Sequence, residues 1–302
     1  MLKVYACHRR GLKMRKWYKY ALDQNMRGER FIGTDEQYSE CALAMGGYNP
    51  DEAYGSKADF FNKYFFGYHL GRLQCYDNFI RGHLSKTDNT ISIASGRGAA
   101  ELFLLEDGYR ITCSDLDITE MLYQETLKLF PQFKFHKLNI LQSPTPAPYD
   151  ALLCLSLIYL FDDVKLSACF DNISRSLSPG GRLILDSAGS PDNFLSYLIH
   201  ECLLKWETAY LLRAKRLLAT SRLDGVVTQH HGYRRTDDEI VQHARQAGLK
   251  LLDRQDYAFL TDFKRSFFLN KLIAASKVSE TALNYLGKHI PYIRMFCFEK
   301  VG

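Results

Sequence analysis

After residue 88, most of the chain alternates between two patterns of hydrophobic and polar residues, one typical of strands and one typical of helices. Short apolar runs have the length of buried strands, and the stretches between them carry apolar residues at helical spacing. The pattern predicts strands at 90–94, 110–113, 133–136, 149–155, 182–186, from 249 onward and at 295–301. It predicts helices at 99–106, 118–129, 164–177 and 236–248. Strands that alternate with helices favour an α/β fold with a doubly wound, mostly parallel sheet of seven strands.

The remaining segments surround or interrupt this pattern. We expect residues 1–88 to form a helical N-terminal arm or lid, because 58–83 has near-helical apolar spacing after a turn-rich loop at 46–56. Residues 89–302 would then form the main domain. Two helical insertions interrupt it, at about 190–232 and 258–291. We expect both insertions to lie on the side where an α/β enzyme builds its substrate pocket.

The amino-acid composition restricts the class of protein but does not identify it. Of the 302 residues, 46% are hydrophobic and 24% are charged, as in ordinary globular proteins. No apolar run is long enough for a membrane span, and we expect neither a transmembrane segment nor a secretory signal. The eight cysteines are scattered and form no CxxC pair, which favours a reducing, cytoplasmic setting. Residues 1–30 hold nine basic and two acidic residues, so this arm is either a solvated tail or a contact for something acidic.

The strongest chemical signal is a glycine turn between a strand and a helix. The segment 90–98 reads Thr-Ile-Ser-Ile-Ala-Ser-Gly-Arg-Gly, and small residues there let the backbone approach a ligand closely. Asp115 stands at the end of the next strand, where a carboxylate can accept hydrogen bonds from a ribose diol. Strand, turn, helix, strand and acid in this order predict a nucleoside site.

The turn does not suit a dinucleotide. A third glycine is missing, and Glu101 places a carboxylate in the first helical turn, where it would repel a pyrophosphate. A nucleoside without phosphate and with a positive charge would meet no such repulsion.

On these residues the chain resembles the class I S-adenosylmethionine-dependent methyltransferases. Segments 90–98 and 111–117 resemble the family's first motif and its acidic successor. The resemblance continues through 149–160, the Ser-Pro-Gly-Gly turn with the strand at 177–185, and the late helix from 235 to 249. It implies a Rossmann-like fold, S-adenosylmethionine as cofactor and S-adenosylhomocysteine as product. The implied cofactor-binding residues are Ala94, Ser95, Gly96, Gly98, Asp115, Leu116, Asn139, Ile140 and Leu155.

Three positions depart from the family pattern. Family members often have an acid where Ser92 stands, which helps to hold the methionine amino group, and a glycine where Ala94 stands. Asn139 stands where an acid commonly contacts the adenine amino group, and its side-chain oxygen can still accept a hydrogen bond.

Candidates for acceptor chemistry follow the fourth strand and the first insertion. The resemblance places the acceptor beside Ser156 and Tyr159, and Tyr159 is also a candidate catalytic residue. His230 and His231 could act as bases near neutral pH. Arg234 could hold an acidic group, or its loop could simply lead into a helix that Thr236 and Glu239 cap. The Asp162–Asp163 pair is typical of a helix N-cap. Tyr48 and Tyr54 are candidate lid residues for substrate binding. Adjacent histidines lack a helical ligand spacing, so we propose no metal.

Four functions remain open on the sequence. The first is methylation of a small molecule, because the cofactor half is complete and no nucleic-acid module is recognisable. The second is methylation of a macromolecule or membrane lipid through the basic arm. The third is a noncatalytic S-adenosylmethionine-binding protein, suggested by Ser92, Ala94 and Asn139; a dinucleotide oxidoreductase comes fourth. The oligomeric state and the acceptor atom are not specified by the sequence.

Overall fold

The computed structural model describes residues 70–96, 98–116, 126–196, 198, 233–257, 271, 289–291 and 293–302. Everything below concerns these residues. The predicted lid tyrosines Tyr48 and Tyr54, the histidines His230 and His231, the start of the 118–129 helix and most of both insertions lie outside them. The division into an arm, a main domain and insertions therefore stays a prediction.

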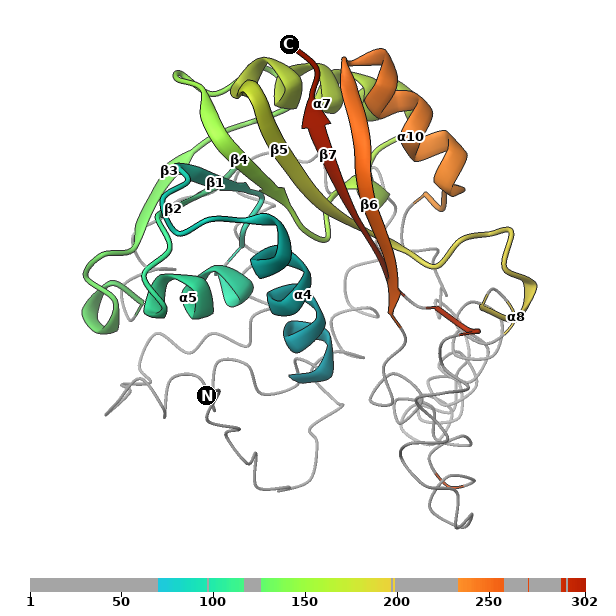
Figure 1. The fold of residues 1–302 in the computed structure, drawn as a ribbon, viewed down its shortest axis with the longest axis horizontal. Helices are drawn as coiled ribbons and strands as arrows, with labels where there is room; N and C mark the ends of the chain where they lie inside the picture. The colour runs from blue at the N-terminus through green and yellow to red at the C-terminus, as the bar shows by residue number, and fades with distance from the viewer. Residues whose placement is uncertain are drawn as a thin grey trace, which may run out of the picture.

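A seven-stranded sheet forms the centre of the described structure (Figure 1), which confirms the predicted α/β class. Its spatial order is β3-β2-β1-β4-β5-β7-β6, and β7 is antiparallel to both of its neighbours while the pairs from β3 to β5 are parallel. The strands are β1 (Thr90–Ile93), β2 (Ile111–Asp115), β3 (Lys134–Lys137), β4 (Tyr149–Cys154), β5 (Leu177–Ala188), β6 (Leu249–Tyr257) and β7 (Ile293–Lys300). The chain order reverses between β1 and β4, so the carboxyl ends of these strands flank a topological switch point, where such folds bind ligands.

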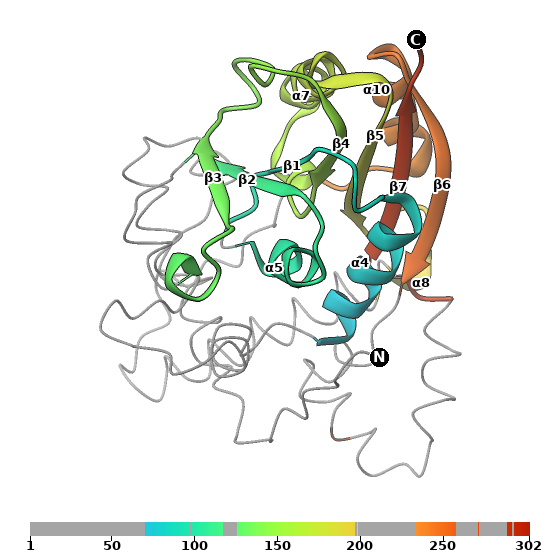
Figure 2. The ribbon, with the colours of Figure 1, turned by 60° about the vertical axis from the view of Figure 1, so that its left-hand side comes forward.

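Helices cover both faces of the sheet (Figures 1 and 2). On one face α4 (Leu70–His83) and α5 (Ala99–Glu106) pack over a buried cluster that includes Leu153. On the other, α7 (Asp163–Ser176) and α10 (Asp237–Gln246) pack over a cluster that includes Leu152. Neighbouring residues of β4 thus enter opposite cores, as the alternation of side chains along a strand requires. The other short elements are η2 (Ile158–Leu160) and α8 (Phe194–Ser196). Among the described helices, none combines the length and the apolar character that crossing a bilayer requires.

The two predicted helix starts are confirmed in atomic detail. The Asp162 carboxylate accepts a hydrogen bond from the Lys165 backbone N–H at 2.9 Å and caps α7. Thr236 accepts from the Glu239 backbone N–H at 3.2 Å, and the Glu239 carboxylate accepts from the Thr236 N–H at 2.6 Å. This reciprocal capping box begins α10. Such motifs involve residues three apart, which is why the sequence alone reveals them.

The strand boundaries differ from the prediction where long-range pairing decides them. β5 begins at Leu177 rather than 182, because Leu177 already pairs with Tyr149 before Arg182 pairs with Ala151. The Ser-Pro-Gly-Gly segment is an irregularity within this strand rather than a turn before it. A Cβ on Gly181 would come within 2.8 Å of the Ser178 carbonyl oxygen, so the segment needs glycine there. β6 extends to Tyr257, because β7 pairs along its length.

Candidate cofactor and acceptor site

The glycine turn is a tight left-handed bend between β1 and α5. Ala94, Gly96 and Gly98 have φ values of 50°, 54° and 72°. The Ser95 backbone N–H donates to the Ser114 carbonyl at 3.0 Å, and the Gly98 N–H donates to the Ser95 carbonyl at 2.9 Å. The bend is therefore fixed to β2 on one side and leads directly into α5 on the other. Ala94 is one of two described residues other than glycine with a positive φ, which is a costly conformation for a residue with a Cβ.

The two glycines of the bend have different surroundings. A Cβ on Gly96 would meet no atom within 4 Å, so open space borders the backbone there. A Cβ on Gly98 would lie 3.2 Å from the Phe133 ring and 3.5 Å from the Cys113 sulfur. Gly96 thus offers the close backbone approach that a ligand needs, whereas Gly98 packs tightly against β2 and the residue before β3.

Asp115 faces the bend from the end of β2. Its Oδ2 accepts a hydrogen bond from the Gly96 N–H at 2.8 Å, and its Oδ1 accepts from the Leu116 N–H at 2.7 Å. The residue is only 2% exposed. These two bonds orient the carboxylate beside the open space at Gly96, and a carboxylate oxygen can accept more than one donor. The arrangement fits a ribose diol at this place.

The segment after β3 provides a second wall at the same edge of the sheet. The Asn139 side-chain oxygen accepts a hydrogen bond from the Leu141 N–H at 3.1 Å, which holds the segment in a local turn. The Ile140 carbonyl accepts from the Asn172 amide of α7 at 2.7 Å, and Ile140 is 6% exposed. The side-chain oxygen of Asn139 already has one donor, so an adenine contact there would have to share it.

Ser156 and Tyr159 follow β4, as predicted, and Ser156 joins a polar cluster that the sequence did not reveal. Asp186, at the carboxyl end of β5, accepts a short hydrogen bond from the Ser156 N–H and another from the Tyr76 hydroxyl of α4. The Ser156 hydroxyl also lies 3.5 Å from this carboxylate, and Ser156 has a φ of 56°. Asp186 is 3% exposed. Tyr76 and Asp186 are 110 positions apart, and no local pattern pairs them.

The loop before α10 reaches the same edge. The Tyr233 N–H donates to the Tyr159 carbonyl at 2.6 Å, and Arg234 donates to the Gly189 carbonyl at 3.1 Å. Arg234 therefore lies near the ends of β4 and β5, close to its predicted neighbour Tyr159. Arg235 is 5% exposed and pairs with Asp163 at 2.8 Å, which gives it a structural role.

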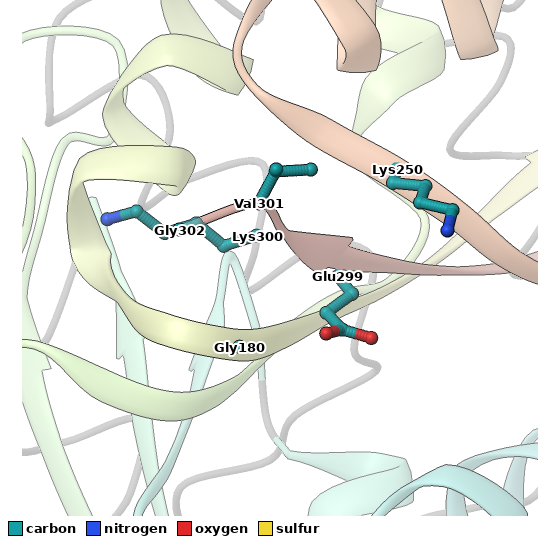
Figure 3. Close-up of a pocket in the computed structure, with 6 residues that line it drawn as sticks. All are labelled: Gly180, Lys250, Glu299, Lys300, Val301 and Gly302. Atoms are coloured by element: carbon teal, nitrogen blue, oxygen red, sulfur yellow. The ribbon is translucent and has the colours of Figure 1, made fainter.

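Two surface hollows lie elsewhere. One, of about 260 Å³, is lined by Gly180, Lys250, Glu299, Lys300, Val301 and Gly302 (Figure 3). Gly180 belongs to the amino-terminal part of β5 and Lys300 ends the antiparallel β7, so this hollow is at the sheet edge opposite the bend. The other, of about 370 Å³, lies on the outer side of α10. Neither hollow contains a residue of the bend. The polar groups at the carboxyl ends of the parallel strands identify that side of the sheet as the candidate site.

Comparisons with known proteins agree with the geometry. Residues 91–185 match the family model described as a methyltransferase domain. An O-methyltransferase family protein from Burkholderia thailandensis superimposes with a TM-score of 0.50 at 12% identity, covering 96% of this chain and 70% of that one. The structure of PigF with S-adenosylhomocysteine gives a TM-score of 0.50 at 16% identity, covering 94% and 69% of the two chains. At such identities the structures show a shared fold. A search of curated proteins found no match.

The matched segment runs from β1 to β5 and contains the bend, Asp115 and the strand after which Ser156 lies. Residues 91–185 thus match a methyltransferase domain, and the match spans the segment that contains the bend and Asp115.

Proposed function

We propose that this protein transfers the methyl group of S-adenosylmethionine to a small-molecule acceptor. The observation that carries the proposal is the open, left-handed bend at Gly96 with the Asp115 carboxylate bonded to its N–H. It leaves the Gly96 backbone open to a ligand at the switch point of the sheet. It also presents carboxylates rather than a free anion-binding helix end, which suits a cationic cofactor better than a pyrophosphate.

When bound, S-adenosylmethionine supplies a methyl group activated by its sulfonium. The acceptor's lone pair forms the new bond to the methyl carbon, the carbon–sulfur bond breaks, and its electron pair stays on the sulfur of S-adenosylhomocysteine. In the protein, Asp115 would hold the ribose, Asn139 and Ile140 would border the adenine, and the backbone of Ala94 to Gly98 would line the rest. Alignment of the acceptor and exclusion of water supply much of the rate of such displacements.

The acceptor would lie beyond the ends of β4 and β5. Ser156 is held there by Asp186, and Tyr159 and Arg234 border the same edge. These polar side chains can orient an acceptor through hydrogen bonds. His230 and His231 remain candidate bases and Tyr48 and Tyr54 candidate lid residues. A cytoplasmic location also stays a proposal.

Binding of S-adenosylhomocysteine to the full chain, measured by calorimetry, tests this function. We expect micromolar affinity, and we expect Asp115→Asn to weaken it by about 10- to 100-fold, because one charge-assisted hydrogen bond is lost. Asp238→Asn, on the exposed start of α10, is the matched control and should bind like the wild type. A wild-type protein that binds neither S-adenosylmethionine nor its product would contradict the proposal.

The alternative acceptors are separated by a truncation. Removing residues 1–30 should leave methylation of a free small acceptor intact. Loss of all transfer to that acceptor, with cofactor affinity unchanged, would favour a macromolecular or lipid acceptor held by the basic arm.

A further inference from the structure

A buried carboxylate lies in the helix that follows the glycine bend. Glu101, in the first turn of α5, is 3% exposed, and its Oε1 accepts a hydrogen bond of 2.5 Å from the Ser92 hydroxyl of β1. Ser92 is itself fully buried. The helix that leaves the bend and the strand that enters it are therefore joined by one polar pair.

This carboxylate has no cationic partner in the described structure. Burial raises the pKa of the Glu101 carboxyl, hydrogen bonds from Ser92 and from the backbone of Glu101 and Ala100 oppose that rise, and the nearby charge of Asp115 adds to it. No Lys, Arg or His among the described residues forms an ion pair with it. A buried carboxylate without a counter-ion is costly for a fold to keep. Glu101 and Asp115 together make the surroundings of the bend suited to a cation.

The position of Glu101 complements the sequence of β1. The family often carries an acid where this chain has Ser92. The Glu101 oxygen lies one short hydrogen bond from the Ser92 hydroxyl, so it occupies the region that a longer acidic side chain at position 92 would reach. The charge missing from the strand is thus present in nearly the same place, supplied by the helix.

We propose that Glu101 supplies the carboxylate that receives the α-amino group of S-adenosylmethionine, and that Ser92 positions it. The inference rests on the proposed function, since it concerns the same cofactor. It makes Ser92 and Glu101 one unit in which the acid has moved from β1 to α5. It also predicts that the chain recognises the amino-acid part of the cofactor despite lacking an acid at position 92.

A purely structural role for Glu101 would have a different consequence. A carboxylate in the first turn of a helix stabilises the helix by interacting with its dipole, but an exposed one does so without the cost of burial. A structural carboxylate would affect folding and all adenosine ligands alike. A carboxylate that receives the amino group would affect only ligands that carry this group.

The experiment compares two ligands and three variants by calorimetry with the full chain. S-adenosylhomocysteine carries the amino group, and 5′-methylthioadenosine keeps the adenosine but lacks the amino-acid part. We expect Glu101→Gln to weaken S-adenosylhomocysteine by about 10- to 100-fold, as for loss of a charge-assisted hydrogen bond, and to leave 5′-methylthioadenosine within about twofold. Glu106→Gln, at the exposed end of the same helix, is the matched control and should change neither.

A rescue variant makes the test sharper. Ser92→Asp combined with Glu101→Ser returns the acid to the strand, and it should recover most of the affinity for S-adenosylhomocysteine that Glu101→Gln loses. If Glu101→Gln does not fold, Glu101→Asp, which keeps the charge on a shorter side chain, should show a smaller loss with the same ligand selectivity.

Equal affinity of wild type and Glu101→Gln for S-adenosylhomocysteine would overturn the inference and leave the proposed function standing. An equal loss for both ligands would also overturn it, because it would indicate a structural role. Failure of the wild type to bind S-adenosylhomocysteine would instead overturn the proposed function.

Discussion

Substitution of Arg294 tests most directly how the carboxyl ends of the strands are held to the loop before α10. This residue of β7 is fully buried and contacts three segments. Its guanidinium forms an ion pair with Asp237 at the start of α10, and it donates to the Ala188 carbonyl at 2.8 Å and the Arg235 carbonyl at 2.6 Å. It therefore fixes the end of β5, two residues beyond Asp186, to the loop before α10. We predict that Arg294→Met destabilises the protein strongly.

The expected loss in the free energy of unfolding follows from how deeply Arg294 and its partners are buried. Removing one member of a buried ion pair costs about 3–5 kcal/mol, because the other charge is left uncompensated. Asp237 is 33% exposed and also pairs with Arg254, so the lower figure applies to the pair. The two carbonyls that lose their donor add up to about 1 kcal/mol each. We therefore expect a total of about 3–5 kcal/mol, which is a large fraction of the roughly 5–15 kcal/mol that stabilises a typical domain.

Urea denaturation followed by circular dichroism measures the effect. At a slope of about 3 kcal/mol per molar, the midpoint should fall by about 1 M or more. Arg254→Met is the matched control, since Arg254 pairs with the same Asp237 but is 32% exposed. It should cost less than about 1 kcal/mol, as exposed pairs do. Similar losses for the two variants would refute the reasoning, because burial would then not decide the cost.

Three further predictions concern the bend and the core. Ala94→Gly should raise the free energy of unfolding by about 0.5–1 kcal/mol, because relief of the left-handed conformation exceeds the added chain entropy. The control Ala147→Gly, in an exposed loop, should not raise it. A rise of equal size in the control would contradict this reasoning. Burial raises the pKa of the Glu101 carboxyl above its ordinary 4.5, so the native state binds the carboxyl proton more tightly than the unfolded chain does. The protonated carboxyl therefore contributes its full stabilisation below pH 4.5, and this stabilisation is lost as the pH rises through the native pKa. Urea titrations should therefore show Glu101→Gln gaining stability over the wild type with rising pH, and a difference independent of pH would argue against it. Thiol alkylation at pH 8, read by mass spectrometry, should spare the buried cysteines of the described structure. Burial raises the pKa of Cys297 to about 12 and that of Cys113 well above its ordinary value, and a hydrogen bond with Cys169 together with burial raises that of Cys154. Rapid alkylation of any of them would contradict their burial. The four are Cys113, Cys154, Cys169 and Cys297.

The sequence by itself determined the features that neighbouring residues encode. The apolar periods gave the class of fold, and the capping residues gave the starts of α7 and α10, because a cap and its partner lie within one helical turn. The glycine bend and Asp115 could also be recognised in advance. In an α/β fold the ends of adjacent parallel strands meet, so a turn after one strand and an acid after the next are brought together.

Only the tertiary structure decided which distant side chains share a site. The pairing of Tyr76 with Asp186, of Ser92 with Glu101 and of Arg294 with Asp237 depends on how α4, α5 and α10 pack against the sheet. The same holds for the early start of β5, which follows from its register with β4. Such contacts are selected by the summed burial of many apolar side chains, and no local pattern carries that sum. The sequence therefore located the glycine bend, and packing decided which charges surround it.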